Sequence, residues 1–169
     1  MLNIRCATMD DLPVIMEIMD SAIAFMRATG NPNQWVNGYP SDALIRLDIA
    51  GQNGYVVVNE SSSVLGYFVF HPGPDPTYAR IYNGSWINNR PYHVVHRIAA
   101  FPDAHGIFSA VIRYCLAEGG DIRIDTYRDN LIMQHLLEKH KFTYCGIIYT
   151  TSGSERLAYQ RVWVNQDDV

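Results

Sequence analysis

One stretch of the chain, residues 96–110, decides the fold; it reads HRIAAFPDAHGIFSA. Its first part is apolar after a polar start, which predicts a strand that Pro102 ends. The turn at 103–106 closes on Gly106 and leads directly into a helix with Ile107 on its apolar face. Such a unit directs backbone N–H groups outward at a helix N-terminus, where a pyrophosphate fits. Many strand–turn–helix units bind nothing, so the interpretation depends on the flanking sequence.

Strands and helices alternate on both sides of this unit. The strand begins near residue 92, and a further strand at 121–127 follows the helix. Two strands joined by a crossover helix are expected to be parallel neighbours. The other predicted elements share apolar periodicity and end at turn-forming residues. They are strands at 3–7, 55–59, 64–70, 142–150 and 157–164 and helices at about 10–30, 41–50 and 130–140.

The order of these elements predicts one α/β domain over residues 1–169. The strands within 55–70 form an antiparallel hairpin, and the mixed sheet has helices on both faces. The proline-rich segment 71–76 is expected to be a surface loop, and 80–86 a short strand or a loop packed on the sheet.

Composition narrows the function classes. Apolar residues make up 48% and charged residues 18%, which is typical of a globular protein. A net charge of −4 without a basic block argues against nucleic acid or an anionic membrane as partner. No signal-peptide pattern and no membrane-spanning apolar run is present. Cys6, Cys115 and Cys145 have no metal-ligand spacing, so we expect reduced thiols in a cytoplasmic protein without a metal.

Three segments together resemble the GNAT superfamily of N-acetyltransferases. The strand end Ala100-Phe-Pro102, with His105-Gly106 after it, is similar to the family's Val-x-Pro strand and Arg-Gly-x-Gly pyrophosphate loop. Residues 121–142 are similar to its second motif, in which Asn130 opens the helix, and residues 4–12 to its usual opening. The resemblance covers nearly the whole chain in order. It implies a twisted, mostly antiparallel sheet of six to seven strands, with a central splayed parallel pair and about four helices.

The resemblance also implies that acetyl-CoA, the acetyl donor, lies between the splayed strands. The strand backbone would hold the pantetheine arm, the amides after Asp103 the pyrophosphate, and one helix-opening side chain the far side of the arm. These cofactor-binding residues are Ile98, Ala99, Ala100, His105, Gly106, Ile107, Phe108, Ser109 and Asn130.

The implied activity is transfer of the acetyl group to a primary amine of a small molecule, amino acid or peptide by direct attack. Two alternatives remain open from the residues. One is a catalytically silent acyl-CoA-binding or sensor domain on the same fold, and the other is an unrelated ligand-binding or partner-binding module. The predicted strands near the C-terminus leave an edge on which a homodimer can form.

His96 is the first candidate for the general base, because histidine exchanges a proton near neutral pH and residue 96 precedes the pantetheine strand. The alternative is a half-buried histidine bonded across the sheet. Asp125, the second candidate catalytic residue, would orient His96 or act through water; otherwise it caps the next helix or pairs with Arg97 or Arg123. For His93 the sequence does not predict whether the side chain faces the substrate pocket or the opposite side of the sheet.

Three aromatic residues, Trp35, Tyr39 and Trp86, are candidates for the wall of the acceptor pocket. Large aromatics in loops need a packing reason, so the alternative is that they hold the loops against the sheet.

The sequence departs from the family pattern at two places. The pyrophosphate loop is about two residues short, has one Gly, and carries His105 where the family has Arg, so we expect acetyl-CoA to bind more weakly than in a typical relative. The family's proton-donating Tyr falls at Leu137. Tyr127, Tyr144 and Tyr149 lie nearby in sequence without an assigned role, and a thiolate can also leave unprotonated.

Overall fold

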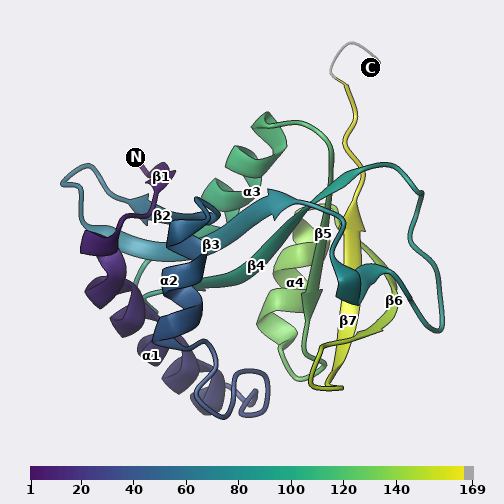
Figure 1. The fold of residues 1–169 in the computed structure, drawn as a ribbon, viewed down its shortest axis with the longest axis horizontal. Coiled ribbons are helices and arrows are strands. Elements are labelled where there is room, and N and C mark those ends of the chain that lie inside the picture. The colour runs from purple at the N-terminus through teal and green to yellow at the C-terminus, as the bar shows by residue number, and fades with distance from the viewer. Residues whose placement is uncertain (166–169) are drawn as a thin grey trace.

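The computed structural model describes residues 1–165, which form one seven-stranded sheet with helices on both faces (Figure 1). The strand order is β1-β2-β3-β4-β5-β7-β6, and only β4 and β5 are parallel neighbours. The strands are β1 (Asn3–Cys6), β2 (Gly54–Val58), β3 (Val64–Pro72), β4 (Tyr92–Ala100), β5 (Asp121–Thr126), β6 (Thr143–Tyr149) and β7 (Glu155–Arg161). The helices are α1 (Leu12–Ala28), α2 (Asp42–Ala50), α3 (Ile107–Ala117) and α4 (Leu131–Lys139). The predicted mixed, mostly antiparallel fold is confirmed.

The period of two along the strands sorts apolar side chains between two cores. Val56, Val58 and Tyr67 belong to the core beneath α1 and α2. Their sequence neighbours Val57 and Phe68 belong to the core beneath α3 and α4. Each helix therefore covers the sheet with one apolar face. Within residues 1–165, no helix is both long and apolar enough to cross a membrane.

The parallel pair is joined at one end only. β4 and β5 pair from Tyr92 with Asp121 as far as Val94 with Arg123, and beyond that point each strand pairs only with its other neighbour. A bulge marks the point where β4 departs, because Arg97 and Ile98 together stand opposite a single residue of β3. The predicted splay of the central strands is thus present in the sheet.

The structure settles two details of the C-terminal half that the sequence left open. The last strand lies between β5 and β6, so β6 and not β7 forms the edge of the sheet. The segment 80–86 is a loop that meets this edge through one isolated bridge, between Tyr82 and Ile147. The homodimer predicted on a C-terminal edge therefore concerns β6, and it stays a prediction.

Candidate functional site

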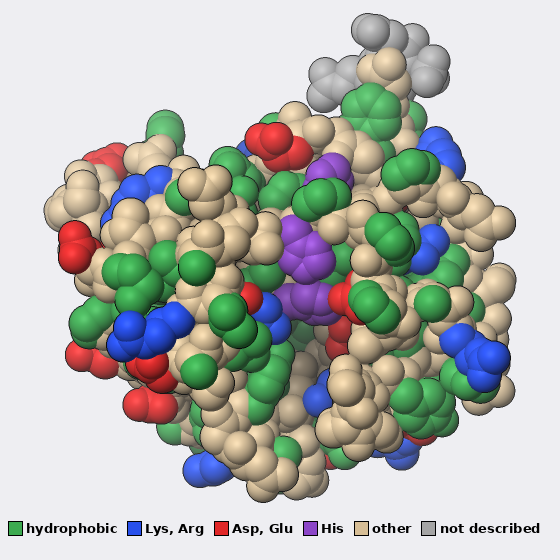
Figure 2. Space-filling model, viewed as in Figure 1, with side chains coloured by type: hydrophobic (Ala, Val, Ile, Leu, Met, Phe, Trp, Pro, Cys, Tyr) green, Lys and Arg blue, Asp and Glu red, His purple; other side chains and the backbone are tan. Residues whose placement is uncertain are grey.

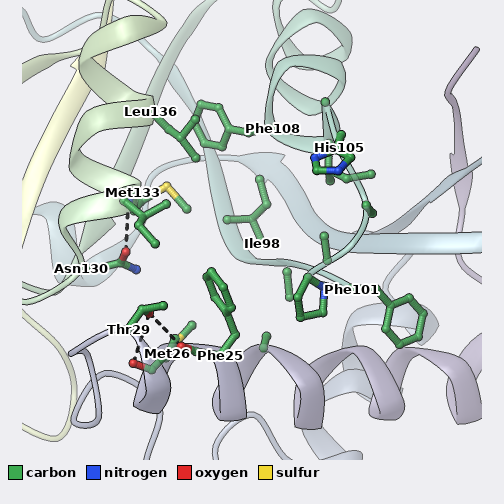
Figure 3. A pocket seen from close by; sticks show the side chains of 18 of the residues that line it. Phe25, Met26, Thr29, Ile98, Phe101, His105, Phe108, Asn130, Met133 and Leu136 are labelled. Atoms are coloured by element: carbon green, nitrogen blue, oxygen red, sulfur yellow. Dashed lines mark hydrogen bonds between the residues drawn. The ribbon is translucent and has the colours of Figure 1, made fainter.

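A cleft of about 410 Å³ lies among α1, α4 and the segment that joins β4 to α3; we call it the helical cleft (Figure 3). Phe25 enters it from α1, Ile98 from β4, and Met133 and Leu136 from α4. These walls are apolar, and the splay of β4 from β5 provides the opening between them. The cleft can hold a long, thin chain with an apolar side.

The turn at the start of α3 forms the polar end of the helical cleft. Gly106 precedes the helix with a φ of 75°, a left-handed conformation that glycine adopts without steric cost. Within the described chain, the backbone N–H groups of residues 105–109 donate no hydrogen bond, and the first helical bond is that from Ala110 to the Gly106 carbonyl. Free N–H groups at a helix N-terminus attract a phosphate group. Phe108 turns its ring toward α4 and contacts His140 edge-on, so it lies beside this turn.

Side chains from α4 supply the positive charge near this turn. Lys139 lines the helical cleft and is exposed to solvent. His140 lies next to it, with its Nε2 atom 2.8 Å from Ser109 Oγ on α3. His105, where the family has an arginine, also lines the cleft and is exposed. The family's single arginine is absent, but Lys139 of α4 and the imidazoles of His105 and His140 lie around the same turn.

The exposed edge of β4 supplies backbone groups to the helical cleft. The N–H of Phe101 donates to the Leu65 carbonyl at 3.0 Å. Along this antiparallel ladder, successive residues of β4 therefore point their backbone N–H and C=O groups alternately toward β3 and away from it. This alternation directs the backbone of Ala99 toward β3 and that of Ala100 toward the cleft. Of the three strand residues predicted to bind the cofactor, Ala100 is thus the best placed to add a strand-like partner.

A second, more polar cavity of about 600 Å³ adjoins the helical cleft; we call it the loop cavity, because loops 33–39, 75–77 and 150–154 form its walls. Figure 2 shows histidine side chains gathered above a hollow in this face of the molecule. Both cavities are lined by Met26, Ile98, Asn130 and Met133, so they meet where β4 and β5 part. Within residues 1–165, no cluster of three or more His, Cys, Asp or Glu residues is arranged to hold a metal ion.

His96 lines the loop cavity and is paired with a carboxylate that the sequence did not suggest. Its Nε2 atom lies 2.8 Å from Oδ2 of Asp75, in the loop after β3. The other oxygen of Asp75 accepts hydrogen bonds from the Thr77 backbone at 2.8 Å and its hydroxyl at 2.7 Å. Burial alone would raise the pKa of the Asp75 carboxyl, but the bonds from His96 and Thr77 outweigh it and hold this pKa well below its usual range. Asp75 is therefore an ionised acceptor facing the imidazole.

Asp125 also lines the loop cavity, but it makes other contacts than those expected. Its Oδ2 atom accepts a hydrogen bond of 2.6 Å from the hydroxyl of Tyr78, whose pKa is raised by burial and by this nearby carboxylate. Its Oδ1 atom lies 3.9 Å from Nε of Arg156. The prediction that Asp125 orients His96 directly is thus wrong, because Asp75 makes that contact. Asn130, and not Asp125, caps α4 by accepting from the Met133 backbone.

The two arginines suggested as partners of Asp125 are both engaged elsewhere. Arg97 makes a two-point contact with Asp48 of α2, at 2.9 and 2.6 Å, and this holds the bulge residue at a φ of 49°. Asp48 also accepts from the hydroxyl of Tyr67. Arg123 stacks between the rings of Trp86 and Tyr92 at the closed end of the parallel pair. Neither predicted ion pair is present.

The three candidate aromatic residues do not share one role: two lie at the wall of a cavity, and one holds a loop against the sheet. Trp35 and Tyr39 line the loop cavity and contact each other edge-on, with ring centroids 6.2 Å apart. Trp86 lines neither cavity; it packs on Tyr78 and donates to that residue's carbonyl at 2.9 Å. For Trp86 the acceptor-wall prediction is wrong, because its ring holds the 79–91 loop against the sheet.

No tyrosine near the family's position reaches the two cavities. Leu137 is fully buried. Tyr127 packs against Arg156, while Tyr144 and Tyr149 lie on the exposed edge strand β6. None of these tyrosines lines the helical cleft or the loop cavity. His93, which had no predicted place, stacks on Phe70 and likewise lines neither cavity.

Sequence reasoning missed a hydrogen-bonded link across the opening between the strands. Gln34, in the loop after α1, accepts from the side chains of Asn31 and Asn130, each at 2.8 Å. Its backbone carbonyl accepts from Arg156 at 3.0 Å. These partners are up to 122 residues apart, and no local pattern marks them. The sequence does contain a signal for Asp75, because a proline-rich loop holds its carboxylate in a restricted position. The prediction of a surface loop makes no use of that signal.

Comparisons with solved structures agree with this geometry. A GNAT-family acetyltransferase from Streptococcus agalactiae 2603 is 31% identical, superposes with a TM-score of 0.86, and covers 97% of this chain and 96% of its own. A protein from Staphylococcus aureus Mu50, proposed to be an acetyltransferase, is 25% identical with a TM-score of 0.67 and coverages of 94% and 97%.

More distant structures share the fold. A GNAT-superfamily phosphinothricin acetyltransferase from Sinorhizobium meliloti, solved in complex with AcCoA, is 18% identical with a TM-score of 0.63. The match covers 96% of this chain and 88% of that one. No family model and no curated protein matches the sequence.

Proposed function

Because this chain belongs to the GNAT family of acetyltransferases, we propose that it transfers an acetyl group from acetyl-CoA to a primary amine. The observation that supports the proposal best is the junction of the two cavities at the splay of β4 and β5. The helical cleft suits a donor that is extended and apolar at one end and anionic at the other. The loop cavity offers a base-bearing chamber for the acceptor.

The residues present fit acetyl-CoA. The free N–H groups of residues 105–109 and the side chain of Lys139 would hold the pyrophosphate. The backbone of Ala100 would bind the pantetheine arm, with Asn130 on the opposite wall. When bound, acetyl-CoA supplies a thioester carbonyl that a neutral amine can attack.

The acceptor amine must first lose a proton, and His96 is the proposed base. The ionised Asp75 carboxylate can only accept, so Nε2 of His96 carries the hydrogen and Nδ1 is left with the free lone pair when the ring is neutral. A backbone N–H of the segment 98–100 would stabilise the negative charge that develops on the carbonyl oxygen. No proton donor for sulfur is assigned, since a thiol of ordinary acidity is a tolerable leaving group.

The test combines a binding and a turnover measurement. With acetyl-CoA at about 100 times its dissociation constant, the melting temperature should rise by about 5–10 °C. With a panel of primary amines added, free CoA thiol should appear at a rate that depends on the amine. A shift in melting temperature without thiol release from any amine would instead support the silent acyl-CoA-binding domain.

Calorimetry then measures the donor affinity itself. The shortened loop predicts a dissociation constant above the sub-micromolar range, and a tighter value would contradict that expectation. The absence of any interaction with acetyl-CoA would contradict the proposal as a whole.

A further inference from the structure

We infer that the loop cavity selects amines with no carboxylate beside the amino group, and that it disfavours free amino acids as acceptors. The inference rests on the proposed function and narrows its substrate class. It starts from the charged side chains that line the cavity, which are Asp75, His96, Arg97, Asp125 and Arg156. A carboxylate on the acceptor needs one of the two arginines, and both are already occupied.

Each nitrogen atom of Arg97 already donates a hydrogen bond, and the charge of its guanidinium group is matched by Asp48. Its Nε and Nη2 atoms bind the two oxygens of Asp48, and its Nη1 atom donates to the Tyr39 hydroxyl at 3.1 Å. Asp48 is itself buried and accepts from the Tyr67 hydroxyl as well. An acceptor carboxylate that drew Arg97 away would leave Asp48 buried without its counter-charge, and burying an unpaired charge is costly.

Arg156 is held in a similar way. Its Nη1 atom donates to Ser154 Oγ and to the Glu155 carbonyl, and its Nη2 atom donates to the Gln34 carbonyl. Its Nε atom faces Asp125 at 3.9 Å. Only 11% of this side chain is exposed. The guanidinium therefore fixes the loops around the cavity and is matched by a carboxylate of its own.

Charge balance then favours a simple ammonium group. With Arg97 matched by Asp48 and Arg156 by Asp125, Asp75 is the remaining fixed charge, and its partner His96 is neutral when it acts as base. A bound ammonium group balances this single negative charge, and moving its proton to His96 keeps the balance. A zwitterionic amino acid adds a second carboxylate, for which none of the described residues lining the cavity has an unengaged cationic group.

The rest of the wall is uncharged and combines apolar side chains with neutral hydrogen-bonding groups. It includes the amides of Asn33 and Asn37 and the hydroxyls of Thr150 and Ser152. Thr126 lines the cavity with a fully buried hydroxyl that has no partner in the described chain. The acceptor is therefore an amine whose other groups are neutral, either apolar or hydrogen-bonding like hydroxyls, phenols and amides, and not anions.

Matched acceptors test this directly. Tyrosine, tyramine and tyrosinamide share one side chain, as do serine, ethanolamine and serinamide. Removing the carboxylate makes the amine more basic and converting it to an amide makes it less basic, so the two changes bracket the effect of amine basicity. Thiol release should give a kcat/KM for each free amino acid at least about tenfold below those of both its partners. Equal or higher values for the free amino acids would overturn this inference while leaving acetyl transfer intact.

A variant tests the origin of the selectivity. Asp125→Asn keeps an acceptor for Tyr78 but removes the carboxylate that matches Arg156, so the preference for tyrosinamide over tyrosine should fall at least about threefold. Asp20→Asn, which removes one exposed charge on α1, should leave the preference unchanged. An unchanged preference in a folded Asp125→Asn protein would overturn the charge argument. If all six compounds and the wider amine panel are inert, the proposed function fails and this inference with it.

Discussion

The helical cleft and the loop cavity meet at one point of the sheet, but they are built from different material. The helical cleft consists mainly of apolar side chains and backbone N–H groups, with Lys139 and two histidines at its polar end, which depends on the conformation of Gly106. The loop cavity consists of charged and amide side chains that are tied together by hydrogen bonds such as those of His96 and Gln34. Backbone N–H groups are present whatever the side chains, so we expect the helical cleft to tolerate changes in sequence better than the loop cavity, which depends on individual side chains.

The largest expected effect comes from replacing His96, the proposed general base in the loop cavity. His96→Gln should lower kcat by about 100-fold or more, because a positioned base contributes that much to proton transfer. The rise in melting temperature with acetyl-CoA should be the same as in the protein without the substitution, since the proposed site of the donor is the helical cleft. Steady-state kinetics and thermal unfolding measure the two effects separately. If His96→Gln also lost acetyl-CoA binding, the proposed division of roles between the two cavities would be contradicted.

A smaller loss is expected from the residue that orients this base. Asp75→Asn should lower kcat by about tenfold and leave the KM for acetyl-CoA unchanged, because Asp75 acts through His96. The variant should also differ in acid stability. The folded-state pKa of Asp75 lies below the unfolded value, so its carboxylate stabilises the fold above about pH 4 and this contribution is lost as the pH falls further.

Thermal unfolding of both proteins across this range checks the sign. The melting temperature of the unchanged protein should exceed that of Asp75→Asn at pH 5, and the difference should shrink below about pH 4. A difference that grew on acidification would contradict the assignment of an ionised carboxylate at this position.

The smallest expected effect is on the helical cleft. The methyl group of Gly106→Ala would make only an ordinary contact, 3.9 Å from Leu2 Cδ1, but the left-handed conformation costs an alanine about 1–2 kcal/mol, so the melting temperature should fall by about 2–8 °C. Acetyl-CoA affinity should fall severalfold in calorimetry, because the neighbouring N–H groups shift. Gly153→Ala carries a similar backbone penalty in the β6–β7 turn and serves as the control. Equal losses of acetyl-CoA affinity in both variants would show that stability, and not the turn, governs donor binding.

The contrast between the two cavities also corresponds to the difference between what the sequence predicts and what it does not. The parallel pair, the turn before α3 and the cap of α4 at Asn130 follow from local periodicity, glycine placement and helix-capping residues. His96 is the predicted base because it precedes the strand that the family resemblance assigns to the pantetheine arm, and this role stays a prediction. Its partner Asp75 was missed, since the β3–β4 register and the loop that follows β3 bring them together over 21 residues. The prediction for Trp86 is wrong because the sequence around a loop aromatic does not show whether its ring faces a ligand or packs on the sheet.

The sequence by itself determined the order of elements, the parallel pair joined by a crossover helix and the backbone turn at Gly106, because these depend on interactions between residues close along the chain, while the splay of the pair was implied by the family resemblance. Only the tertiary structure decided which carboxylate meets His96, that Arg97 is matched by Asp48, and that Gln34 joins two sides of the opening. Such contacts depend on the positions of whole strands and helices. A side chain's charge is fixed by its identity, but whether that charge is free to bind a substrate is fixed by what packs against it.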